Sequence, residues 1–173
     1  MRSPSAKGVP ASRSRSGSRV SGDRSFSQHS TADDAIPYLL RQVAERLGRS
    51  LAEALKPFEQ TPSVYRVLIA LTRRSPARIT ELAELTLIEP STLSRTVDRM
   101  ESDGLVTRAS GSGDGRTVQV AITANGRAFL DRILPAVAAQ YVWSIHDVPT
   151  RDLRALRAAL KAMLHNLKVS PIK

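Results

Sequence analysis

The sequence predicts a mainly α-helical protein with a small β-hairpin wing, arranged as a winged helix-turn-helix flanked by N- and C-terminal helices. Three observations predict it. A short helix with apolar periodicity ends in a turn, and a second helix then begins at Pro90. Two alternating segments follow and close on a glycine-rich loop. Long amphipathic segments lie on both sides of this unit, and their apolar faces must be buried against another surface.

The N-terminal flank is predicted to be a long helix over residues 33–57. Asp33 and Asp34 suit the positive end of a helix, and Pro57 ends it. Its apolar residues recur at three- and four-residue spacing: Ile36, Leu39, Leu40, Val43, Leu47, Leu51 and Leu55. The C-terminal flank, within 124–168, repeats this pattern in Leu153, Leu156, Leu160, Met163, Leu164 and Leu167. These faces pack either against each other or against a second copy of the chain.

Residues 61–123 are expected to form the central lobe of a domain that covers 32–173. Thr61 followed by Pro62 predicts a helix start, with Val64, Val67, Leu68 and Leu71 on its buried face. Thr80 is expected to cap the next, short helix, with Leu82, Ala83 and Leu85 facing inward.

The helix predicted over 90–103 carries the candidate binding residues. Its buried face is formed by Leu93, Val97 and Met100. The other positions are short, polar or cationic: Ser91, Thr92, Ser94, Arg95, Arg99 and Ser102. Hydroxyls allow close approach to DNA, and an arginine can donate two hydrogen bonds to guanine. Asp98 is expected to pair with Arg95 or Arg99. The alternative is an ordinary surface helix whose charges are solvated.

The wing is predicted over 105–123, as two strands joined by a loop with three glycines. Asp114 and Arg116 lie on either side of Gly115. The aspartate could brace the arginine, whose guanidinium would then reach an adjacent minor groove. The alternative is a simple solvated turn.

Composition limits the other classes of function. The 173 residues carry a formal net charge of +10 and 41% hydrophobic residues, so the chain can form a core and is suited to a polyanionic partner. It has no cysteine, and its three histidines are widely separated, so neither a metal nor another cofactor is expected. With no apolar run of about 18 residues and no secretory signal, we expect a cytoplasmic protein without a membrane partner.

Residues 1–31 form a separate region in which arginine and serine alternate. Six basic residues and one acidic residue precede Thr31, which gives this segment half of the net charge. We expect it to be disordered. It is either an auxiliary arm that contacts DNA phosphates or an extension without a function.

These residues together resemble the MarR (multiple antibiotic resistance regulator) family of winged helix-turn-helix transcriptional regulators, from about Leu39 to Leu167. The matching motifs are ITELA at 79–83, PSTLSRTVDRME at 90–101, GLVTR at 104–108, DGR at 114–116 and ITANG at 122–126.

The resemblance implies a homodimer whose terminal helices form the interface. Each recognition helix and wing would then dock on one half of a near-palindromic site in double-stranded DNA. It also implies release from DNA by a small phenolic or carboxylated effector. The aromatic residues that could line its pocket also suit ordinary packing: Tyr38, Phe58, Tyr65, Tyr141 and Trp143.

We therefore expect a DNA-binding transcriptional repressor that a small ligand releases. DNA contacts are expected from Ser91, Thr92, Ser94, Arg95, Arg99, Asp114 and Arg116. The alternative is a dimeric ligand-sensing or protein-interaction module that has lost specific DNA binding. No nucleophile and base arrangement is visible, so we do not expect an enzyme.

Overall fold

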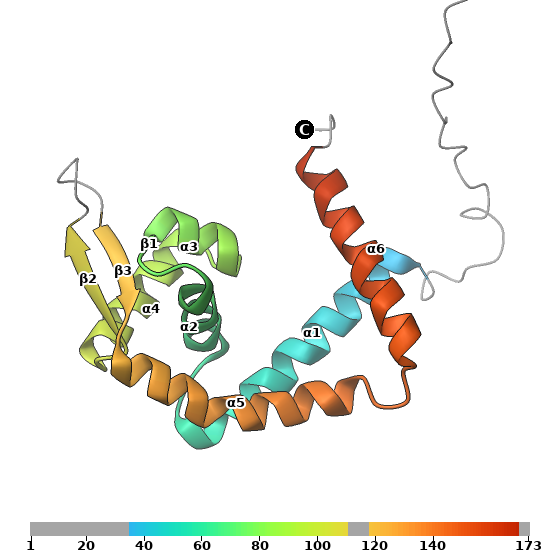
Figure 1. Ribbon diagram of the computed structural model, residues 1–173, viewed down its shortest axis with the longest axis horizontal. Coiled ribbons are helices and arrows are strands. Elements are labelled where there is room, and N and C mark those ends of the chain that lie inside the picture. The colour runs from blue at the N-terminus through green and yellow to red at the C-terminus, as the bar shows by residue number, and fades with distance from the viewer. Residues whose placement is uncertain (1–34, 111–117, 170–173) are drawn as a thin grey trace, which may run out of the picture. The chain divides into compact units, whose positions relative to one another are not determined.

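The computed structural model describes residues 35–110 and 118–169 (Figure 1). The chain comprises two units, Met1–Leu39 and Leu40–Lys173, and only the end of the first is described. The elements are α1 (Ile36–Leu55), η3 (Lys56–Phe58), α2 (Pro62–Arg73), β1 (Ala77–Arg78), α3 (Ile79–Thr86), α4 (Pro90–Ser102), β2 (Val106–Ser110), β3 (Val118–Ile122), α5 (Ala124–Ser144) and α6 (Thr150–Lys168). This order confirms the predicted helix-turn-helix and its β-hairpin. The basic segment 1–31 and its proposed role lie outside the described residues.

The core lies where α2, α3 and α4 meet the sheet and the first half of α5. The predicted inner faces of α2 and α4 are confirmed, because Leu68 and Leu71 on α2 and Val97 and Met100 on α4 are fully buried. Ile133 of α5 joins the same cluster. The buried face of α4 is therefore fixed on the core, and the opposite face is turned outward.

The sheet has three antiparallel strands in the order β1-β3-β2. The wing strands pair from Val106 opposite Ile122 to Ser110 opposite Val118. The strand β1 was not predicted from the sequence, because two residues are too few to show an alternating pattern. It pairs Ala77 with Val120 and thereby joins the wing to the start of α3.

Two predictions about α3 are wrong. Its N-cap is Arg78 and not Thr80, because β1 keeps the backbone extended through Arg78 and the helix starts directly after it. The carboxylate of Glu81 accepts a hydrogen bond of 2.9 Å from the Arg78 backbone N–H. Leu85 was expected to face inward but is 54% exposed, whereas Thr86 is buried. The Thr86 hydroxyl is satisfied by donating to the Leu82 carbonyl at 2.6 Å.

The wing and α5 meet at a close backbone contact. The hydroxyl of Thr123 caps α5 by accepting from the Gly126 N–H at 2.9 Å, and it donates to the Gly104 carbonyl at 2.8 Å. A Cβ atom at Gly126 would lie 2.1 Å from the Leu105 carbonyl oxygen. Only glycine fits there, so the base of the wing and the start of α5 are held together.

The terminal helices leave apolar side chains at the surface. Of α1, only Ala54 and Leu55 are buried, and α6 has no buried residue. Leu156 and Leu164 of α6 are both more than half exposed. The two helices therefore do not bury their apolar faces fully within one chain. In the described part of the chain, every helix is too short or too polar to span a lipid bilayer.

Candidate nucleic-acid interface and effector pocket

The exposed face of α4 carries most of the predicted binding residues. Ser91, Thr92, Arg95 and Arg99 are all exposed, on the side opposite the buried Leu93, Val97 and Met100. Arg99 lies 3.7 Å from the Asp103 carboxylate, and both side chains are largely exposed. Arg95 makes no ion pair with any described residue. Its guanidinium is therefore available to a partner outside the lobe.

The start of α4 is capped by a carboxylate that the sequence did not single out. Glu89 precedes Pro90, and one of its oxygens accepts from the backbone N–H groups of Ser91 at 2.9 Å and Thr92 at 3.1 Å. The Ser91 hydroxyl donates to the same oxygen. Because this hydroxyl donates its only proton to Glu89, Ser91 can accept a hydrogen bond from a donor group on a base but has no proton left for a phosphate oxygen.

These hydrogen bonds, first the one from the Ser91 hydroxyl and then those from the two backbone amides, hold the pKa of Glu89 below its ordinary value. A lowered pKa means that ionised Glu89 stabilises the folded state at neutral pH, and that this contribution is lost as the pH falls through the pKa of the folded state. We expect the free energy of unfolding of Glu89→Gln to be lower than that of the wild type at neutral pH. This difference should become smaller at acidic pH.

Urea unfolding at about pH 7 and about pH 3 measures this difference. Glu84→Gln, on the exposed side of α3, is the matched control and should show no such narrowing. If the difference in free energy of unfolding between Glu89→Gln and the wild type stayed constant with pH, the capping role would be contradicted.

The pairing predicted for Asp98 is wrong. Its partner is Arg108 of β2, whose guanidinium contacts the Asp98 carboxylate and lies 3.7 Å from that of Glu101. The reason is tertiary, because β2 runs beside α4 and brings Arg108 against it. Ser94 is exposed, but its carbonyl accepts from Arg108 at 3.3 Å, so this residue lies on the wing side of α4.

The remaining predicted site residues, Asp114 and Arg116, lie outside the described residues, which omit 111–117. The paired ends of β2 and β3 at Ser110 and Val118 are described, and the loop connects them. The expected minor-groove contact of Arg116 therefore stays a prediction.

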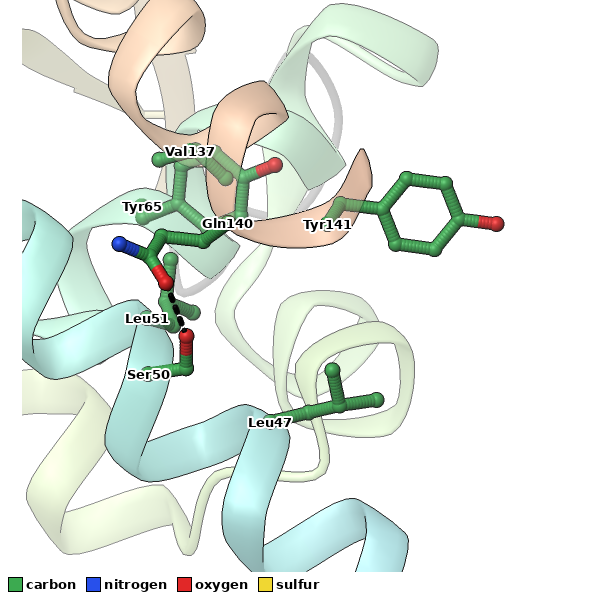
Figure 2. Close-up of a pocket in the computed structure, with 7 residues that line it drawn as sticks. All are labelled: Leu47, Ser50, Leu51, Tyr65, Val137, Gln140 and Tyr141. Carbon is green, nitrogen blue, oxygen red and sulfur yellow. Dashed lines mark hydrogen bonds between the residues drawn. The ribbon is translucent and has the colours of Figure 1, made fainter. Parts of the chain in front are cut away.

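A separate cavity of about 220 Å³ lies between α1, α2 and α5, lined by Leu47, Ser50, Leu51, Tyr65, Val137, Gln140 and Tyr141 (Figure 2). The Ser50 hydroxyl donates to the Gln140 side-chain carbonyl at 2.7 Å. Burial raises the pKa of Tyr65, and the nearby Arg73 partly offsets this. Of the aromatic residues predicted as pocket candidates, Tyr65 and Tyr141 are present, and the Tyr141 ring points away from the hydrogen-bonded pair.

A larger open groove of about 460 Å³ lies beside the first cavity, between α1, the end of α5 and α6. Its walls are mainly aliphatic and include Val43, Leu156, Leu160 and Leu164. Several of the apolar side chains that α1 and α6 leave exposed line this groove, among them Val43, Leu156 and Leu164.

The chain is similar in sequence and in fold to known transcriptional regulators. A sequence profile of the MarR family matches residues 61–117. The crystal structure of a MarR-family transcriptional regulator from Silicibacter pomeroyi is 30% identical to this chain, with a TM-score of 0.69, and the match covers 79% of this chain and 92% of that one. This chain belongs to the MarR family of transcriptional regulators.

Two further relatives extend the comparison of this MarR-family protein. The transcriptional repressor IacR of Pseudomonas putida is 27% identical over 151 residues, which cover 84% of this chain and 90% of the repressor. CouR from Rhodococcus jostii RHA1, crystallised with p-coumaroyl-CoA, is 24% identical with a TM-score of 0.69, and the match covers 78% of this chain and 95% of that one. The sequence match to IacR and the fold match to CouR therefore each extend along nearly the whole length of the relative.

Proposed function

We propose that this MarR-family chain is a homodimeric transcriptional repressor without enzymatic activity, which binds double-stranded DNA in the cytoplasm and is released by a small ligand. The observation that carries the proposal is the outward face of α4. It presents hydroxyls and two arginines, and its other side is anchored in the core. An α-helix fits the width of the major groove, and hydroxyl and guanidinium groups can hydrogen-bond to the base edges there.

The residues proposed to contact DNA divide by position. Arg95 and Arg99 on the outward face of α4 supply cations for guanine or phosphate, and Ser91, Thr92 and Ser94 supply polar atoms. In a dimer, two such helices enter successive major grooves about 34 to 36 Å apart. Asp114 and Arg116 complete the proposal, with Arg116 in the minor groove.

The proposed dimer follows from the unburied apolar faces of the terminal helices, within 33–57 and 124–168. A second copy seated on the groove between α1 and α6 would cover Leu156, Leu160 and Leu164. Burial of such aliphatic side chains contributes about 25 cal/mol per Å².

We expect Leu164→Glu to raise the dimer dissociation constant at least about tenfold, since the substitution places a charge on a surface that must lose its water. Sedimentation equilibrium measures this constant. Ala162→Glu adds the same charge at an exposed position on the other side of α6 and is expected to leave it nearly unchanged. Equal constants for Leu164→Glu and the wild type would contradict the proposed interface.

The cavity of Figure 2 is the proposed effector site. It offers apolar walls, a tyrosine ring and the Ser50–Gln140 pair, a combination suited to an aromatic ligand with hydrogen-bonding groups. The structure of CouR with p-coumaroyl-CoA gives a small-molecule precedent in the same fold.

Fluorescence anisotropy tests the function directly. The full chain is titrated with a labelled duplex from its own upstream region, and random duplex is added as competitor. Specific binding supports the repressor. Equal displacement by random and specific duplex would overturn it and leave a winged-helix sensing or interaction module.

A further inference from the structure

Arg108 of β2 joins the wing to the recognition helix α4. Its guanidinium contacts the Asp98 carboxylate, lies 3.7 Å from a Glu101 oxygen and donates to the Ser94 carbonyl at 3.3 Å. Its backbone N–H donates to the other Glu101 oxygen at 3.1 Å. One residue of the sheet therefore contacts α4 at three places.

The three contacted positions follow one another along one side of α4. Ser94, Asp98 and Glu101 are spaced at i, i+4 and i+7, so they form a stripe between the buried face and the outward face. An arginine that bridges this stripe spans successive turns of the helix. It fixes both the distance of α4 from β2 and the rotation of α4 about its axis.

The stripe also poses an electrostatic problem for DNA binding. Asp98 and Glu101 are two carboxylates on the helix proposed to enter a groove lined with phosphates, and their side chains are 57% and 41% exposed. Like charges brought together across an interface weaken binding. Among the described residues, Arg108 is the only cation that forms an ion pair with either carboxylate.

The Arg108 side chain is directed inward and not toward solvent. It is only 24% exposed, and its Nε atom is buried without a hydrogen-bond partner in the described part of the chain. Both terminal nitrogens are used by α4. This geometry distinguishes Arg108 from Arg95, which is exposed and forms no ion pair within the described part of the chain.

We propose that Arg108 is a positioning residue for DNA recognition, which sets α4 against the wing and offsets one of the two negative charges of Asp98 and Glu101 without itself contacting DNA. The inference rests on the proposed function, because it assigns a role within DNA binding. It predicts that the loss of Arg108 can be compensated by removing one carboxylate.

The test uses the full chain and a duplex that the wild-type protein has selected from a random-sequence library. Arg108→Met should weaken binding about tenfold or more, because two unpaired carboxylates then face the DNA. The double variant Arg108→Met/Asp98→Asn has the wild-type net charge at this stripe and should bind within about threefold of the wild type. Arg151→Met, an equal charge loss at an exposed site on α6, is the control and should change affinity little.

Two further measurements separate positioning from the other roles that an arginine can have. The salt dependence of Arg108→Met should match that of the wild type, because the loss of a phosphate contact would lower its slope by about one. Thermal unfolding shows whether each variant is folded at the assay temperature. If Arg108→Met is not folded, the double variant decides, since it leaves one unpaired carboxylate, the exposed Glu101, in place of two and keeps the wild-type net charge of the stripe.

Several results would overturn the inference. They are wild-type affinity in folded Arg108→Met, a reduced salt slope, or a folded double variant that binds tenfold or more weakly than the wild type. Failure of the wild-type protein to select any duplex would instead overturn the proposed function, and this inference with it.

Discussion

Replacing Arg95 with alanine is expected to lower the affinity for the selected duplex by about 1 to 3 kcal/mol, or about 5- to 160-fold, if the guanidinium binds a base pair. The expectation follows from its place on the outward face of α4 and from the absence of an ion pair with any described residue. Within residues 35–110 and 118–169, no ion pair or side-chain hydrogen bond uses its donors.

Anisotropy titrations with duplexes substituted one base pair at a time measure both affinity and preference. Arg95→Ala should relax the preference at one position in each half-site, whereas a residue that contacts only phosphate weakens all sequences alike. Arg151→Ala is the charge-matched control. Unchanged affinity and unchanged preference in Arg95→Ala would show that the outward face of α4 does not bind DNA as proposed.

Replacing Gly126 with alanine is expected to destabilise the fold by about 3 kcal/mol, at the upper end of the usual cost of overpacking. The added Cβ would lie 2.1 Å from the Leu105 carbonyl oxygen and 3.0 Å from a side-chain carbon of Ile122. Relief requires moving α5 away from the base of the wing, which breaks the hydrogen bonds of Thr123.

Differential scanning calorimetry at fixed protein concentration should show a melting temperature about 10 °C below that of the wild type. Gly48→Ala is the matched control, because a Cβ at Gly48 meets nothing within 4 Å on α1. Alanine there should be neutral or stabilising by up to about 1 kcal/mol. A Gly126→Ala protein as stable as the wild type would contradict the close contact.

Local signals in the sequence predicted the helical frame well. Pro90 marked the start of α4, and the spacing of Leu93, Val97 and Met100 identified its buried face. Proline at a first helical position and apolar spacing act over a few residues, so they can be recognised without the fold. The outward side chains of α4 followed from the same pattern.

The features that the sequence did not predict depend on contacts between elements. Arg108 pairs with Asp98 because β2 lies beside α4, and no local pattern indicates that pairing in advance. The start of α3 depends on β1, which exists only because β3 is present to pair with it. Glu89 as a cap was missed because glutamate is not among the preferred capping residues, although it precedes Pro90.

The lining of the cavity between α1, α2 and α5 has a consequence for signalling chemistry. All seven side chains around it are uncharged, so an anion that enters it would exchange hydration for walls that hold no countercharge. A weak acid that buries its acidic group there would have to enter protonated. For each unit of pH above the pKa of such an acid, the concentration of its protonated form would fall about tenfold. The total concentration of effector needed for a response would therefore depend on the pH inside the cell.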